Sequence, residues 1–127
     1  MDHRNKILVV DDEKTFTGLL KLNLEATGRF EVCIENDPRK VVMTALNFKP
    51  NLILLDVIMP ELEGPDVMVQ LRENFVLHDV PIIFLTATIT REEVISQGGR
   101  IGGNQFVAKP STFKDLLTSI ENNLMVC

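Results

Sequence analysis

The chain has few of the residues that mark specialised proteins. Its 127 residues include no Trp, no Tyr and only two cysteines, Cys33 and Cys127. Two cysteines without metal-ligand spacing argue against a disulfide framework. No apolar run is long enough to span a membrane, and the run at residues 7–10 is too short for the core of a signal peptide. We therefore expect a cytoplasmic protein.

Basic residues are in the minority. Lys and Arg number 13 against 18 Asp and Glu, which gives a net charge of -5. This charge repels nucleic-acid phosphates and anionic membranes, so we expect no direct binding to nucleic acid or membrane. The length and an apolar content of 45% are typical of one globular domain, here taken as residues 1–127.

Apolar segments predict five β-strands. Unbroken aliphatic and β-branched runs near residues 6–10, 51–55 and 80–85 are typical of strands that are buried on both faces of a parallel sheet. Weaker segments at residues 31–34 and 105–108 complete the set.

Helical patterns alternate with these strands. Apolar residues recur three or four apart within residues 16–24 and 41–46, and helices are also expected over residues 65–74, 90–97 and 112–124. The alternation predicts an α/β fold in which an open five-stranded parallel sheet carries helices on both faces.

Turn residues agree with these boundaries. Asp37 followed by Pro38 predicts a helix N-cap, while Gly28 and the pair Lys49 and Pro50 stand where helices should end. The stretch at residues 98–103 holds four glycines, and either a mobile loop or a tight helix stop would suit it.

Polar residues follow four of the five predicted strands. They are Asp11, Asp12 and Glu13 after the first strand, Asp56 after the third, Thr86 after the fourth, and Lys109 with Pro110 after the fifth. Ligands of open parallel sheets bind beyond the carboxyl ends of the strands, where we expect these groups to meet. Each residue alone could be a helix cap or a turn residue, but together they favour a site for phosphoryl chemistry.

The clustered carboxylates favour a divalent cation. Magnesium prefers oxygen ligands and is typically held by one or two carboxylates together with phosphate oxygens. Asp12 and Asp56 would ligate it directly, and Asp11 directly or through water. Asp56 would attack a phosphoryl donor, while the Lys109 ammonium and the Thr86 hydroxyl would hold the transferred oxygens.

Jointly, these motifs resemble the receiver domains of two-component response regulators, including the single-domain chemotaxis regulators. The motifs are VDDE at residues 10–13, LDVIMP at residues 55–60 with Gly64, LTA at residues 85–87 and FVAKP at residues 106–110. The resemblance covers essentially the whole chain. It implies a flavodoxin-like, doubly wound sheet with strand order 2-1-3-4-5.

The resemblance also implies roles for single residues. It makes Asp56 the phosphoacceptor, Asp11 and Asp12 the acidic pair that holds magnesium or manganese, and Lys109 the phosphoryl-binding ammonium. It implies that the backbone carbonyl of Ile58 is a further metal ligand.

Further implications concern a switch and a peptide bond. In the family, phosphorylation draws the hydroxyl at the position of Thr86 towards the acyl phosphate, and the aromatic residue at the position of Phe106 turns inward. Simple packing is an equally good reading of Phe106. The resemblance also implies that the bond between Lys109 and Pro110 is cis, a minority state for X–Pro bonds.

The implied partners are a sensor histidine kinase or a phosphotransfer protein, and a downstream effector protein or an effector domain absent from this chain. The residues do not decide whether the chain forms a homodimer or belongs to a longer regulator. The resemblance implies a phosphoacceptor that promotes its own phosphorylation and dephosphorylation, not a turnover enzyme.

Three other functions share this architecture. An aspartyl-phosphate phosphatase would need an acid two residues beyond the nucleophile, where the chain has Ile58. A docking module that never takes phosphate would not need Asp12, Asp56, Thr86 and Lys109. A flavin carrier would place phosphate against an acidic rim, and the chain has no Trp or Tyr to cover the flavin ring.

Overall fold

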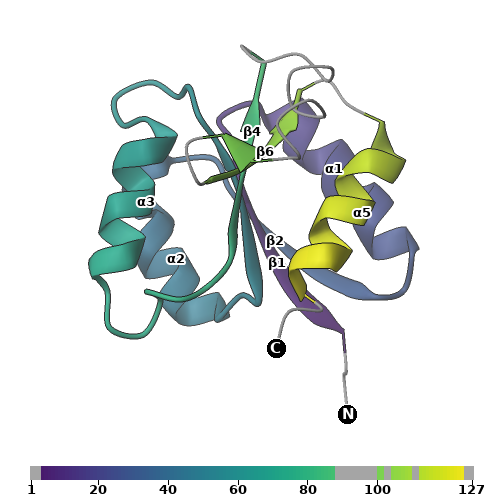
Figure 1. The fold of residues 1–127 in the computed structure, drawn as a ribbon, viewed down its shortest axis with the longest axis horizontal. Coiled ribbons are helices and arrows are strands. Elements are labelled where there is room, and N and C mark those ends of the chain that lie inside the picture. Colours follow the sequence, from purple (N-terminus) through teal and green to yellow (C-terminus); the bar gives the residue numbers. More distant parts are fainter. Residues whose placement is uncertain (1–3, 88–99, 102–103, 110–111, 125–127) are drawn as a thin grey trace.

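The computed structural model describes residues 4–87, 100–101, 104–109 and 112–124, which form a sheet between two helical layers (Figure 1). The strands are β1 (Asn5–Val10), β2 (Phe30–Glu35), β3 (Leu52–Asp56), β4 (Ile82–Thr86), β5 (Arg100–Ile101) and β6 (Asn104–Ala108). The α-helices are α1 (Lys14–Ala26), α2 (Val41–Phe48), α3 (Gly64–Glu73) and α5 (Phe113–Leu124), and a 3-10 turn, η1 (Pro38–Lys40), precedes α2.

The sheet has the order β2-β1-β3-β4-β6-β5. All pairs are parallel except β5 with β6. The five parallel strands are those predicted from the apolar runs, and their order confirms the expected doubly wound fold. The strand β5 was not predicted, because a strand of two residues in a glycine-rich stretch carries no periodic pattern. The other residues of that stretch lie outside the described part of the chain.

The core lies on both faces of the sheet. Every residue of β3 and β4 is buried, which explains why their sequences are continuous apolar runs. Successive residues of a strand point to opposite faces, so each strand supplies both layers. One layer packs beneath α1 and α5 and includes Val9, Leu54 and Val107. The other packs beneath α2 and α3, on the opposite side in Figure 1.

The predicted helix ends are confirmed. Asp37 is the N-cap of η1, and its carboxylate accepts a hydrogen bond of 3.0 Å from the backbone N–H of Arg39. Helix α2 ends before Lys49, which adopts the left-handed conformation at φ 58°, and Gly28 follows α1 at φ 76°. The helix predicted over residues 90–97 lies outside the described residues. None of the described helices is long and apolar enough to cross a membrane.

Candidate functional site

Three charged side chains meet because of the alternation along their strands. Asp11, Asp56 and Lys109 each stand two residues after a core residue that faces α1 and α5, and therefore extend the same layer towards the carboxyl edge. Those core residues are Val9, Leu54 and Val107. Because β1, β3, β4 and β6 are neighbours in the sheet, residues that are 98 positions apart in the chain come into contact.

The carboxylates of Asp11, Asp12 and Asp56 form a cluster in which one oxygen of each lies within 4.8 Å of the others. Asp11 is fully buried and Asp56 is 6% exposed, whereas Asp12 is exposed. Burial and then the negative charge of Asp11 raise the pKa of Asp56 to about 6, although Lys109 acts in the opposite direction. Burial also raises the pKa of Asp11, despite its hydrogen bond with Lys109.

This donor set suits a hard divalent cation. Three carboxylate oxygens at such distances repel one another, and the charge of Asp11 adds to the effect of burial in raising the pKa of Asp56. A magnesium ion would favour the ionised form of each group, and carboxylate oxygens are the ligands that it prefers. The cluster thus lies where the sequence analysis expected the acidic metal site.

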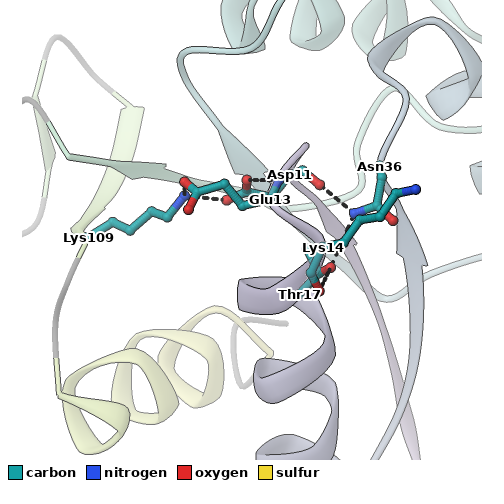
Figure 2. A network of polar contacts seen from close by, with 6 residues as sticks. All are labelled: Asp11, Glu13, Lys14, Thr17, Asn36 and Lys109. Atoms are coloured by element: carbon teal, nitrogen blue, oxygen red, sulfur yellow. Dashed lines mark hydrogen bonds and ion pairs between the residues drawn. The ribbon is translucent and has the colours of Figure 1, made fainter.

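The Lys109 side chain reaches back to the start of α1 (Figure 2). Its ammonium lies 2.7 Å from Asp11 Oδ2, 2.5 Å from Glu13 Oε1 and 4.5 Å from the centre of the Phe16 ring. Within the described part of the chain, its ion pairs join it to Asp11 and Glu13 and not to Asp56. Burial would lower the pKa of Lys109, but the hydrogen bonds with Asp11 and Glu13 outweigh it and raise that pKa.

Asn36 connects the ends of β2 and β1 to α1. Its amide donates hydrogen bonds to the backbone carbonyl of Asp11 at 2.6 Å and to the Thr17 hydroxyl at 3.1 Å (Figure 2). The Thr17 hydroxyl in turn donates to the carbonyl of Lys14. The sequence analysis assigned no role to Asn36, because nothing local to β2 shows which strand end it would contact.

Thr86 and Phe106 lie on adjacent strands. Thr86 is 1% exposed at the end of β4, and its carbonyl accepts a hydrogen bond of 2.8 Å from the Lys109 backbone N–H. Phe106 is half-buried and stacks on Phe84, its register partner in β4, with ring centroids 5.1 Å apart. Phe84 and Thr86 share one face of β4, so the ring pair and the threonine lie on the same side of the sheet.

The loop from β3 to α3 folds tightly against Asp56. The N–H of Gly64 donates a hydrogen bond of 2.8 Å to the Val57 carbonyl, and a Cβ on Gly64 would collide with the carbonyl of Asp56. Only glycine allows the backbone at residue 64 to come this close to the Asp56 carbonyl. The Ile58 side chain is 57% exposed. The bond between Lys109 and Pro110 lies outside the described residues.

Comparison with known proteins agrees with this fold. The profile of the response regulator receiver domain family matches residues 7–121. The chain belongs to the receiver domains of two-component response regulators.

A sequence relative is the alkaline phosphatase synthesis transcriptional regulatory protein PhoP of Bacillus subtilis. It is 38% identical over 105 residues, which cover 83% of this chain and 42% of that protein. The chain therefore spans less than half the length of this relative.

Solved structures have the same fold. The chemotaxis protein CheY4 of Vibrio cholerae superposes with a TM-score of 0.80 at 26% identity, over 95% of this chain and 99% of that one. The signal receiver domain of a signal transduction histidine kinase from Syntrophus aciditrophicus gives 0.77 at 29% identity, over 94% of this chain and 89% of that one.

Proposed function

We propose that this receiver domain takes a phosphoryl group from the phosphohistidine of a sensor kinase or phosphotransfer protein onto Asp56, with magnesium bound beside it. One observation carries the proposal. The carboxylates of Asp11, Asp12 and Asp56 cluster at one sheet edge, and the Lys109 ammonium contacts that cluster. Asp56 thus lies where the nearby Lys109 ammonium can attract an anionic phosphoryl group.

In the proposed transfer, an oxygen of Asp56 forms a bond to phosphorus while the phosphorus–nitrogen bond of the phosphohistidine breaks. The imidazole leaves with the electron pair and takes a proton from solvent. Asp56 reacts as its anion, and bound magnesium would favour that form of a carboxylate whose pKa is otherwise raised to about 6. Asp11, Asp12, Asp56 and the Ile58 carbonyl would hold magnesium, which offsets the repulsion between the acceptor and the donor phosphate.

Two side chains then bind the new acyl phosphate. The Lys109 ammonium contacts one oxygen, and the Thr86 hydroxyl contacts another. Movement of Thr86 opens a space, and Phe106 leaves its position on Phe84 and turns into that space. This movement changes the surface of β6 and α5. A partner that prefers the second surface then reports the phosphoryl group, because its binding shifts the population between the two states.

The partners on either side follow from the family. The donor is a sensor kinase or a phosphotransfer protein in the cytoplasm, and the recipient is an effector protein or an effector domain outside this chain. The relative PhoP is named a transcriptional regulatory protein, and a DNA-binding effector is one such recipient. Because the net charge of this chain is -5, any DNA contact would be made by the effector.

Intact-mass measurement tests the proposal. The protein is incubated with magnesium and acetyl phosphate, a small phosphoryl donor. The expected result is one added phosphoryl group that base removes, absent in Asp56→Ala and in magnesium-free samples. Asp66→Ala, which removes an exposed carboxylate on α3, is the matched control and should react as the parent protein does.

Other outcomes would support the competing functions. A parent protein that gains nothing would be a docking module. Continuous release of phosphate from simple esters would indicate a phosphatase. Phosphorylation of Asp56→Ala would show that another residue is the acceptor.

A further inference from the structure

The Lys109 ammonium is held by residues between the end of β1 and the first turn of α1. It donates hydrogen bonds to the carboxylates of Asp11 and Glu13 (Figure 2). It also lies 4.5 Å from the centre of the Phe16 ring. The Lys109 side chain is only 11% exposed, so water cannot readily replace these contacts. A phosphoryl group on Asp56 would therefore compete with these partners for the ammonium.

The three contacts differ in what their loss costs. The Asp11 carboxylate is fully buried, and its ion pair with Lys109 is shielded from water; without a bound cation, an unpaired charge there would be strongly unfavourable. The Glu13 carboxylate belongs to a side chain that is 62% exposed, and water can solvate it when the lysine leaves. The contact with Glu13 is thus the one that is released most easily.

Glu13 is nevertheless held in place. It is the N-cap residue of α1, its backbone N–H donates to Asp11 Oδ1 at 3.0 Å, and its carbonyl accepts the first helical hydrogen bond from Thr17. The carboxylate therefore projects from a fixed point of the backbone, and Lys109 meets it at a defined position.

We propose that Glu13 is a positioning residue that holds Lys109 in its resting place and competes with the phosphoryl group for the ammonium. The inference rests on the proposed function and adds a residue that sets how strongly the phosphorylated state is favoured. Glu13 touches neither the acceptor nor the donor and acts through Lys109. Removing its contact should strengthen the binding of a phosphoryl group.

The test is the affinity for beryllofluoride, a phosphoryl mimic, measured by fluorine NMR at saturating magnesium. Glu13→Gln removes the charge, and Glu13→Asp keeps the charge on a side chain one methylene shorter, which cannot reach Lys109. Both variants should bind beryllofluoride about two- to fivefold more tightly than the parent, as expected for an exposed ion pair. High salt should reduce the difference in beryllofluoride affinity between these variants and the parent.

Glu63→Gln is the matched control for charge. Glu63 is the exposed N-cap residue of α3, and its side chain makes no capping hydrogen bond. Its substitution should leave the affinity close to that of the parent. If Glu13→Asp binds as the parent does, or if Glu63→Gln gains as much as Glu13→Gln, only the general charge matters and the proposal fails.

A second measurement separates this inference from the proposed function. NMR relaxation of the Lys109 side chain, in protein without a phosphoryl donor, should show greater motion in both Glu13 variants than in Glu63→Gln. Unchanged motion would overturn the role of Glu13 even if Asp56 accepts phosphate. A parent protein that shows neither phosphorylation nor beryllofluoride binding would instead overturn the proposed function, and the competition proposed for Glu13 with it.

Discussion

Asp56 is a carboxylate whose surroundings favour its neutral form. Burial, with 6% of the residue exposed, raises its pKa most; Asp11, Asp12 and Glu13 raise it further, and Lys109 acts in the opposite direction. A group with a raised pKa binds its proton more tightly in the folded state than in the unfolded state. The free energy of unfolding therefore falls as the pH rises from the ordinary value of 3.8 to about 6, and the lost stability is not regained above that.

Asp56→Asn should remove this dependence. Without magnesium, the variant should be more stable than the parent at neutral pH, by up to about 3 kcal/mol for a shift of roughly two units. The advantage should grow between pH 3.8 and about 6 and then stay constant. Chemical denaturation at several pH values measures it, and Asp66→Asn, on the exposed face of α3, should show no such trend.

Gly64 and Gly18 make a matched pair of glycines. A Cβ on Gly64 would collide with the Asp56 carbonyl and lie 3.0 Å from Val57 Cα, while a Cβ on Gly18 would meet nothing within 4 Å. Gly64→Ala should therefore cost about 1–3 kcal/mol of stability. Gly18→Ala, within α1, should add about 0.5–1 kcal/mol. Thermal unfolding measures both, and a Gly64→Ala protein as stable as the parent would contradict the packing described for that loop.

At the scale of elements, α2 ends on a strained residue. Lys49 is the C-cap of α2 at φ 58° and ψ 64°, a left-handed conformation in which the Cβ of an L-residue is crowded. Lys49→Gly should raise the free energy of unfolding by about 1 kcal/mol. Lys49→Ala keeps the Cβ and is the control, and an equal gain in both variants would point to the lost charge instead.

The strands β4 and β6 are joined through an aromatic pair. Phe84 and Phe106 stack at 5.1 Å in register, and the switch proposed above requires Phe106 to leave this position. A double-mutant cycle with Phe84→Leu and Phe106→Leu should give a coupling energy of about 0.5–1.5 kcal/mol in the resting protein. The coupling should decrease when beryllofluoride and magnesium are bound, and an unchanged value would argue against the movement.

For the whole molecule, the acidic cluster should link metal binding to folding. A cation that binds only the folded state stabilises it, by about 2.7 kcal/mol at a concentration one hundred times the dissociation constant. Magnesium should raise the melting temperature at neutral pH, and the effect should weaken below a pH of about 6 as Asp56 takes up its proton. Asp12→Asn should lose most of the effect, whereas Asp66→Asn should keep it.

Much of this architecture could be predicted from the sequence. The buried strands β3 and β4 appear as continuous apolar runs because both of their faces are covered, and Asp37, Gly28 and Lys49 mark helix ends through local backbone chemistry. The position of Asp56 at the end of a strand follows from the same runs. The strand β5 could not be predicted, because two residues are too few to show a period.

The sequence alone determined which strand ends carry acidic and basic groups, because apolar runs and the residues that follow them are local features. Tertiary structure alone decided which of these groups touch. Lys109 pairs with Asp11 and Glu13 rather than with Asp56, and Asn36 holds the carbonyl of Asp11. Such contacts join residues that are 25 to 98 positions apart, and their partners depend on strand order and side-chain reach, which no local pattern contains.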